Sequence, residues 1–243
     1  MQTASTSMNT MPTSSEERSA LNKVMWFGII ELVGIVAGWV ASFYVFSNFF
    51  NASLFTSLPS NPTPAQVANA MGFIFQDVIY IIPLAVGIEL VGLVVLTLGF
   101  RGLAKVDSAR FHVSTPFMVV LIVGLLIAAS GAIPLLNGIP NIIANAYANC
   151  TYPYGSTTCT PSAAFFNQFN SVLAYFGLIL LGGLLTLIGY IGGLILGLWR
   201  VGSRYNQTTL KIGAIFQIIP LLNIVAPILI LLGANEAKNM LGK

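Results

Sequence analysis

A run of twenty-eight residues from Val172 to Trp199 contains no charged side chain, and Arg200 ends it. As an α-helix rising about 1.5 Å per residue, this run would be about 42 Å long, which exceeds the roughly 30 Å hydrocarbon layer of a bilayer. It therefore predicts a tilted transmembrane helix. Gly189, Gly193 and Gly197 recur every four residues, a spacing that lets two helix backbones approach closely in lipid. We expect this helix to be the packing centre of a bundle.

The composition of the whole chain agrees with this interpretation. Hydrophobic residues make up 56% of the 243 positions and charged residues only 7%, whereas a soluble domain carries about 25% charged residues. The net charge of +3 comes from ten Lys and Arg that stand beside apolar stretches, which indicates membrane topology and not a nucleic-acid surface. The sequence therefore predicts an all-α integral membrane protein, with loops too short for a second folded domain.

About five transmembrane helices are predicted, arranged as two tandem hairpins and a fifth element broken by proline. Duplication of one hairpin would explain the tandem order, and so would convergence of two membrane hairpins. Ser14 and Glu17 have capping-box spacing, so the first helix should begin near Ser15. Thr63 and Pro64 predict another helix start, with a bend at Pro83. The expected spans are 24–47, 78–100, 117–138, 172–199 and 212–232.

Four regions follow from these spans. Residues 1–15 are predicted to be a disordered cytoplasmic tail, because they are polar and featureless. The first hairpin covers 16–110 with an extracytoplasmic loop at 48–77, and the second covers 111–211 with an extracytoplasmic loop at 139–171. The broken fifth element and the C-terminal tail occupy 212–243.

Basic residues set the predicted orientation, because cytoplasmic loops are enriched in Lys and Arg. Eight of the ten cluster at the ends of spans that would face the cytoplasm, which predicts a multi-pass plasma-membrane protein with its N-terminus inside. A contact with anionic lipid or a partner is a weaker alternative for the same clusters. These residues are Arg18, Lys23, Arg101, Lys105, Arg110, Arg200, Arg204 and Lys211.

The fifth element, Ile212 to Leu232, is interrupted by Pro220 and Pro227. Gln217 and Asn223 are available to bond the backbone groups that the prolines free. Either a broken span or a re-entrant hairpin satisfies this pattern. We favour the span, because each arm of a hairpin would be only about nine residues, roughly 13 Å. The charge rule favours the hairpin.

The second outer loop contains the two cysteines of the chain, Cys150 and Cys159. Their position in a predicted extracytoplasmic loop favours a disulfide, worth about 2 to 3 kcal/mol from loop entropy, over two free thiols or a metal pair. Asn51 and Asn149 each begin an N-glycosylation sequon on the predicted outer side, while the sequon at Asn206 falls inside and should be silent.

Two carboxylates, Glu31 and Glu89, lie within predicted spans, each followed by Leu-Val-Gly. A buried carboxylate costs at least about 2.5 kcal/mol, so each should face protein or water, or be protonated. If the two meet at one depth, they form a possible proton or ion site. The structural alternative is a pair of protonated glutamates at a close helix contact, where Gly34 and Gly38 supply small-residue spacing.

Catalytic patterns are missing from the sequence. It contains no H-E-x-x-H, P-loop, G-x-S-x-G or C-x-x-C, and its one histidine, His112, is expected to be a solvated loop residue. We therefore predict no enzyme activity, no cofactor and no metal site.

A patterned run near the C-terminus carries a resemblance to a known family. It contains WRVGSRY at 199–205, LKIG at 210–213 and NIVAPIL at 223–229. These segments are similar to the domain-of-unknown-function 973 family of archaeal multi-span membrane proteins. The similarity is clearest over the last 45 residues and is general in layout before them. The resemblance implies an archaeal plasma membrane and no assigned activity, so no catalytic residue can be transferred.

Two functions remain as hypotheses. The first is a non-catalytic scaffold or accessory subunit of a membrane complex, with a protein partner or a second copy of the chain beside it in the bilayer. The alternative is a small ion- or proton-coupled transporter or channel that uses Glu31, Glu89 and the element broken at Pro220 and Pro227.

Overall fold

The computed structural model describes residues 14–51, 64–147, 150–151, 158–159 and 163–241. Residues 1–13 of the predicted disordered tail and the Thr63 cap therefore lie outside the described residues, whereas residues 14 and 15 of that tail are helical. Asn149 also lies outside the described residues, and Asn51 is described only as the last residue of a helix.

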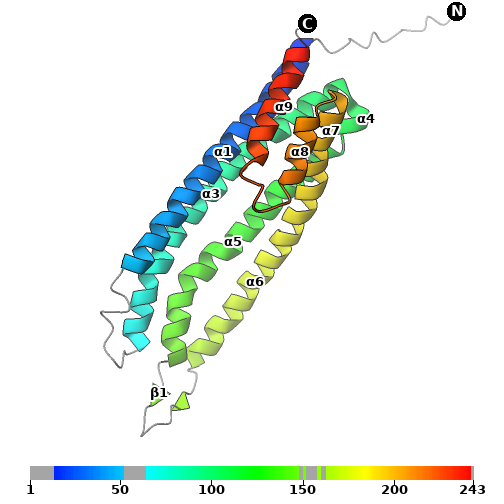
Figure 1. Ribbon diagram of the computed structural model, residues 1–243. Helices are drawn as coiled ribbons and strands as arrows, with labels where there is room; N and C mark the ends of the chain where they lie inside the picture. Colours follow the sequence, from blue (N-terminus) through cyan, green and yellow to red (C-terminus); the bar gives the residue numbers. More distant parts are fainter. Residues whose placement is uncertain (1–13, 52–63, 148–149, 152–157, 160–162, 242–243) are drawn as a thin grey trace, which may run out of the picture. The chain divides into compact units, whose positions relative to one another are not determined.

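Helices dominate the described part of the chain (Figure 1). A π-helical segment, η1, joins α6 to α7 without a break, and one pair of two-residue strands lies between α5 and α6. The elements are α1 (Ser14–Asn51), α3 (Pro64–Val106), α4 (Ser108–Phe111), α5 (Ser114–Tyr147), β1 (Cys150–Thr151), β2 (Thr158–Cys159), α6 (Ala163–Gly189), η1 (Tyr190–Ile195), α7 (Leu196–Arg204), α8 (Thr208–Phe216) and α9 (Ala226–Met240).

Four helices are long and apolar enough to cross a bilayer, which confirms the all-α membrane class. They cover Ser15–Ser47, Val78–Val106, Ser108–Ile142 and Phe165–Arg204. The helices extend beyond the predicted spans: α3 starts at Pro64 and passes through Pro83, and α5 continues beyond Pro134 and Pro140 to Tyr147. The segments expected as loops at 48–77 and 139–171 are therefore helical at both ends.

The chain divides into two compact units, and each of the four long helices contributes a segment to both. Unit 1 comprises residues 1–32, 91–119 and 190–243, and unit 2 comprises 33–90 and 120–189. All ten Lys and Arg of the sequence fall within the ranges of unit 1.

Unit 1 contains a well-packed apolar core. Large side chains with less than 2% exposure come from its helices, and they include Phe27 of α1, Phe100 of α3, Phe111 of α4, Leu198 of α7 and Leu210 of α8. Phe100 and Phe111 stack with ring centroids 6.5 Å apart. A turn with Asn206 at φ 52° follows α7, and the Gln207 N–H donates to the Gly202 carbonyl at 2.7 Å, as in a Schellman motif. This turn reverses the chain into α8.

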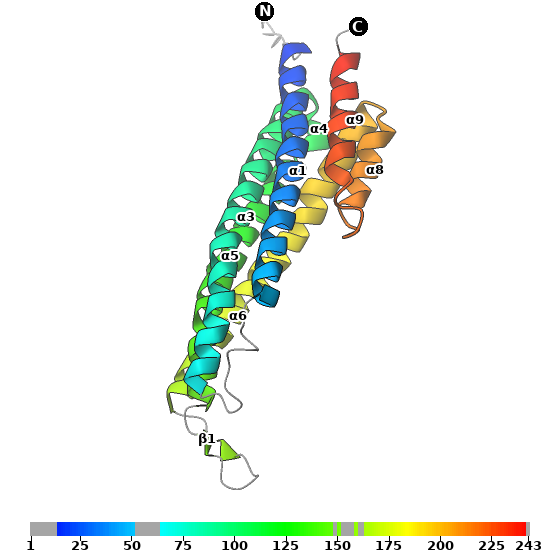
Figure 2. The ribbon, with the colours of Figure 1, turned by 60° about the vertical axis from the view of Figure 1, so that its left-hand side comes forward.

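The fifth element folds as a hairpin within unit 1, so our preference for a fifth span was wrong. Figure 2 shows α8 and α9 packed against each other, with α9 beside the N-terminal part of α1. A Cβ added at Gly213 would lie 3.1 Å from Ile230, and one added at Gly233 would lie 2.8 Å from the Leu210 nitrogen. Helices of nine and fifteen residues reach about 13 and 22 Å, too short to cross the hydrocarbon layer. The structure therefore has four long apolar helices and a short hairpin.

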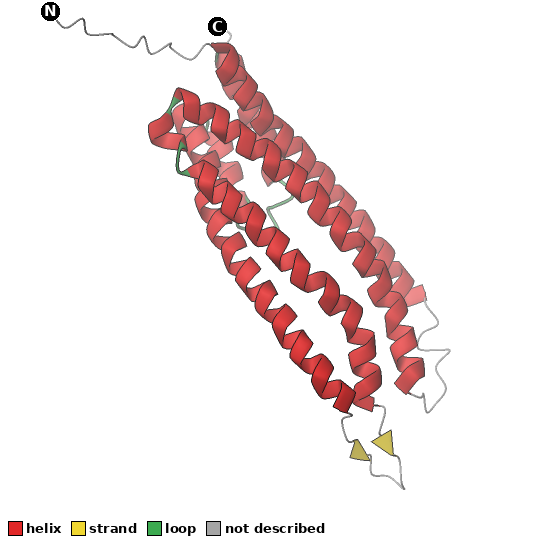
Figure 3. Ribbon diagram, turned by 180° about the vertical axis from the view of Figure 1, so that it is seen from behind, coloured by secondary structure: helices red, strands yellow, loops and turns green. Residues whose placement is uncertain are grey.

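Close backbone contacts between α5 and α6 hold unit 2 together. A Cβ added at Gly124 would lie 2.5 Å from the Thr186 nitrogen, and one at Gly131 would lie 2.7 Å from the Tyr175 carbonyl oxygen. Gly182 faces the Ala128 backbone, and a Cβ there would overlap it. The strands β1 and β2 lie beyond the ends of α5 and α6 (Figure 3). They pair antiparallel, with Cys150 opposite Cys159.

The glycines singled out in the sequence lie in different surroundings. A Cβ at Gly189 would overlap Leu121, and one at Gly193 would lie 2.8 Å from the Met118 nitrogen. Gly197 lies against the ring of Phe100, and Gly34 lies 3.1 Å from Ile88 by the same measure. At Gly38, no described atom lies within 4 Å.

Candidate intramembrane polar site

Glu31 is held by a side chain from the C-terminal hairpin. Gln217 Nε2 donates a hydrogen bond to Glu31 Oε1 at 2.5 Å. Glu31 belongs to α1, and Gln217 ends α8, where the chain leaves the helix and enters the turns before α9. The Gln217 residue is only 5% exposed. A buried amide needs partners, and here the carboxyl of Glu31 supplies one.

Tyr190 completes a chain of hydrogen bonds on the other side of Gln217. Its hydroxyl oxygen lies 2.9 Å from Gln217 Oε1 and 2.8 Å from the Gln217 backbone carbonyl oxygen, so its single proton is shared between these two acceptors. Tyr190 is the first residue of η1, and π-helical segments inside α-helices often occur at functional sites. Three elements far apart in sequence, α1, η1 and α8, thus meet at one uncharged amide beside an intramembrane carboxyl.

The turns that follow Gln217 contain Pro220 and Asn223. Pro220 removes a backbone donor, and the chain closes with short turns such as the Asn223 N–H to the Ile219 carbonyl at 2.9 Å. The Asn223 side-chain oxygen is buried and makes no hydrogen bond with any described residue. Broken helices with unpaired oxygens are the form in which membrane transporters present ion sites.

Glu89 does not belong to this cluster. It lies in unit 2, whereas Glu31 lies in unit 1, so the predicted meeting of the two glutamates stays a prediction. Within the described part of the chain, Glu89 makes no hydrogen bond or ion pair. No group of three His, Cys, Asp or Glu side chains there is placed to hold a metal ion.

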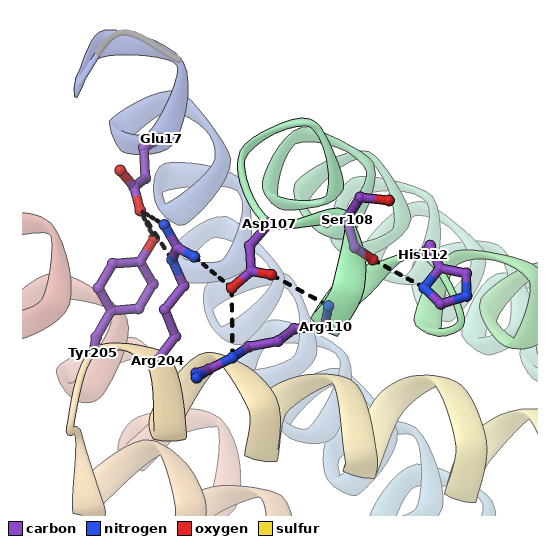
Figure 4. A network of polar contacts seen from close by, with 7 residues as sticks. All are labelled: Glu17, Asp107, Ser108, Arg110, His112, Arg204 and Tyr205. Atoms are coloured by element: carbon purple, nitrogen blue, oxygen red, sulfur yellow. Dashed lines mark hydrogen bonds and ion pairs between the residues drawn. The ribbon is translucent and has the colours of Figure 1, made fainter. Parts of the chain in front are cut away.

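A second polar network lies at the ends of α1, α3 and α7 in unit 1 (Figure 4). Arg204 donates from Nη1 to Asp107 Oδ2 at 2.6 Å, and from Nε and Nη2 to Glu17 Oε1 at 3.1 and 3.0 Å. The Tyr205 hydroxyl donates to the same Glu17 oxygen at 2.5 Å. We call these four residues the Arg204 clamp. It ties three helices together with groups that are mostly buried.

The remaining basic residues are distributed around this clamp. Arg110 pairs with Asp107 at 3.4 Å, and Arg200 donates to the buried Ser114 hydroxyl at 3.0 Å. Lys238 donates to Asn22 at 3.1 Å, which ties α9 to α1. His112 is exposed, and its Nδ1 lies 2.9 Å from the Ser108 carbonyl oxygen. The other basic residues that the structure describes are the exposed Arg18, Arg101 and Lys105 and the half-buried Lys23 and Lys211, and Lys243 lies outside the described residues.

A family model described as "Protein of unknown function (DUF973)" matches residues 17–243. The chain belongs to the DUF973 family. The searches of curated proteins and of solved structures found no match. The DUF973 match extends far beyond the C-terminal run that carried the resemblance, because it includes all four long helices. It begins at Glu17, so both the Arg204 clamp and the Glu31 cluster lie inside the DUF973 region.

Sequence reasoning found some members of these clusters and missed others. Glu31 was singled out as a carboxylate in an apolar run, and Gln217 as a side chain that could bond the backbone freed by the prolines, but nothing in the sequence joins them. Tyr190 was missed, because a tyrosine in an apolar helix carries no signal of its own. The pairing of Arg204 with Glu17 and Asp107 was also missed, although a membrane protein with few carboxylates would be expected to use them near its arginines.

Proposed function

We propose that this DUF973 protein is a small proton-coupled membrane transporter in which Glu31 carries the proton. The hydrogen bond from Gln217 to Glu31 is the observation that supports this proposal. Intramembrane carboxyls mark proton relays in transporters, and here the carboxyl touches the one broken element of unit 1. No catalytic step is proposed.

The coupling would act through the strength of that hydrogen bond. An amide bonds more strongly to a carboxylate than to a neutral carboxylic acid. Protonation of Glu31 would therefore weaken its hold on Gln217 and shift the C-terminal hairpin toward a second position. Because Tyr190 bonds the same amide, the shift would also reach η1. The proton would thus bias an element made of two short helices and the turns that join them.

Proton uptake into liposomes tests this proposal. The purified full chain is reconstituted around an internal pH indicator, and a membrane potential is imposed with a potassium ionophore. We expect uptake by the natural protein and its loss in Glu31→Gln. Glu236→Gln is the matched control, because Glu236 is exposed on α9 and should leave uptake unchanged. Absence of uptake by the natural protein, or uptake that Glu31→Gln leaves intact, would contradict the proposal.

A scaffold or accessory subunit is the second candidate function. The Arg204 clamp supports it, because ion pairs between three helix ends restrict their relative movement, as a scaffold requires. In that case the Glu31 to Gln217 bond is a static contact, and Glu31→Gln and Glu89→Gln would leave the function intact. Gentle solubilisation would then recover a larger complex with a protein partner or further copies of the chain. A particle that runs as a detergent-bound monomer would count against the scaffold.

We also propose that unit 1 faces the cytoplasm of a plasma membrane and that the Cys150 to Cys159 connection lies outside. The concentration of all ten basic residues in unit 1 supports this orientation. To test it, Arg101→Cys is introduced into a chain without its two native cysteines. On intact cells, a thiol reagent that cannot cross the membrane should leave this single cysteine unlabelled. Glycosylation at Asn51 and Asn149 belongs to the same proposal. Asn51→Gln and Asn149→Gln should each lower the mass of the purified protein by one glycan.

A further inference from the structure

A cavity of about 440 Å³ lies between α5 and α6 within unit 2. Its lining comes from residues 134–142 of α5 and 168–175 of α6. The volume falls within the range of about 300 to 1,000 Å³ that small-molecule sites occupy. The cavity begins three residues after Gly131, where the two helix backbones are still in contact. Pro134, which lines the cavity, and Pro140 interrupt the hydrogen bonding of α5 along this stretch.

Two rows of polar side chains face the cavity. Asn137 and Asn141 stand four residues apart on α5, so they share one face of that helix. Gln168, Ser171 and Tyr175 are spaced by three and four residues on α6 and share a face in the same way. None of the lining residues carries a charge, although the cavity lies between two helices that are otherwise apolar.

Several of these polar atoms remain available to a ligand. Among the described residues, the Asn137 and Asn141 amides and the Tyr175 hydroxyl make no hydrogen bond. The Ser171 hydroxyl donates only a long bond of 3.4 Å to the Asn167 carbonyl. Asn137, Asn141 and Ser171 are exposed and not buried, so an incoming polar ligand can reach their side chains directly.

We propose that this cavity binds an uncharged, hydroxyl-rich group of the hexosyl type. A side-chain amide presents a donor and an acceptor side by side, which suits neighbouring hydroxyls. The Tyr175 ring, Pro134 and Val172 offer apolar surface to the C–H face of a sugar. The absence of Lys, Arg, Asp and Glu from the lining removes the charge that a phosphate or an ammonium group would require. The cavity belongs to unit 2 and Glu31 to unit 1, and none of the contacts of Glu31 enters this proposal, so it can be tested independently of proton transport.

The hexosyl group has two sources, a glycolipid headgroup and a free sugar. The full chain is placed in phosphatidylcholine nanodiscs that contain a glucosyl diacylglycerol, and bound lipid is measured by native mass spectrometry. Free glucose is then added as a competitor. Displacement of the lipid by glucose supports a site open to free sugar, and binding of the lipid without displacement supports a headgroup site.

Substitutions of the lining residues test whether the bound lipid occupies this cavity. Asn137→Leu combined with Asn141→Leu should weaken binding about tenfold or more, because two amides are lost. Tyr175→Phe removes only a hydroxyl and should weaken binding less while preserving the fold. Asn167→Leu is the matched control, since Asn167 is exposed on α6 and does not line the cavity. The proposal is overturned if neither probe binds, or if the double variant, folded by circular dichroism, binds as well as the natural chain.

Discussion

Arg204 Nη1 lies 2.6 Å from Asp107 Oδ2, so the end of α7 is fixed to the turn between α3 and α4. The same guanidinium bonds Glu17 of α1 through two of its nitrogens. Removing it takes from Glu17 the one ion-pair partner it has among the described residues and leaves Asp107 only the more exposed Arg110. One arginine therefore determines whether three helix ends can stay together.

We expect Arg204→Met to lower the free energy of unfolding by about 3 kcal/mol, the lower end for breaking a buried ion pair, since the three side chains keep 12% to 23% exposure. Unfolding by sodium dodecyl sulfate in mixed micelles measures this loss. Arg101→Met is the matched control, because Arg101 is exposed and should change the value by less than about 0.5 kcal/mol. Equal losses in the two variants would show that the clamp contributes nothing.

Ionisation of the Tyr205 hydroxyl should weaken the Arg204 clamp at alkaline pH. Burial raises the pKa of this hydroxyl above its usual range, and the hydrogen bond to Glu17 raises it further. A group whose pKa is raised on folding adds stability below its unfolded pKa and loses it as the pH rises toward the folded value. Stability should therefore fall above about pH 10.

Tyr205→Phe tests that dependence. The variant should be less stable than the natural chain near neutral pH, because Glu17 loses a donor. Its stability should fall less steeply above about pH 10, because the titrating group is gone. Melting temperatures across the alkaline range give both values, and Tyr80→Phe, at an exposed position, is the control. If melting temperature falls with pH equally steeply in Tyr205→Phe and in the natural chain, titration of Tyr205 is not the cause of the alkaline loss of stability.

Two adjacent glycines of α6 allow a clean test of helix contact in unit 2. A Cβ at Gly182 would overlap the backbone of Ala128, whereas one at Gly183 would meet no described atom within 4 Å. Gly182→Ala should lower the free energy of unfolding by about 1 to 3 kcal/mol, because it forces α5 away from α6. Gly183→Ala should stay within about 1 kcal/mol of the natural chain. The same unfolding assay measures the free energy of unfolding of both variants. A larger loss in Gly183→Ala than in Gly182→Ala would contradict the close contact between α5 and α6.

The sequence predicted the membrane helices well, because each is specified by a long local run of apolar residues. It also pointed to glycines that do pack closely: Gly189 lies against Leu121, Gly193 against Met118 and Gly197 against Phe100. It did not point to Gly124, Gly131 and Gly182, which make further close contacts in unit 2. Small residues identify a face that permits contact, but which helix lies opposite depends on the whole bundle.

The candidate site was only half predictable for a related reason. Glu31 stands out in an apolar run because its burial is costly, but its partner lies 186 residues away in the chain. The C-terminal element was assigned as a span, because its length suits one crossing. The contacts of Gly213 with Ile230 and of Gly233 with Leu210 make the hairpin instead, and such long-range packing leaves no local signature.

The register of the two short strands leads to the last prediction. Residues opposite each other in an antiparallel pair have Cα atoms about 4.5 to 5.5 Å apart, within the 4.4 to 6.8 Å that disulfides span. Cys150 lies opposite Cys159, so we expect them to be bonded. A maleimide should label neither thiol in the denatured, unreduced protein and both after reduction.

Single and double variants distinguish a bond from two independent thiols. Cys150→Ser and Cys159→Ser should each lower the free energy of unfolding by about 2 to 3 kcal/mol, because either one opens the same loop. The double variant should then lose no more than a single one, since the bond can be removed only once. Losses that add, or labelling before reduction, would mean that the strand pair holds its register through backbone hydrogen bonds alone.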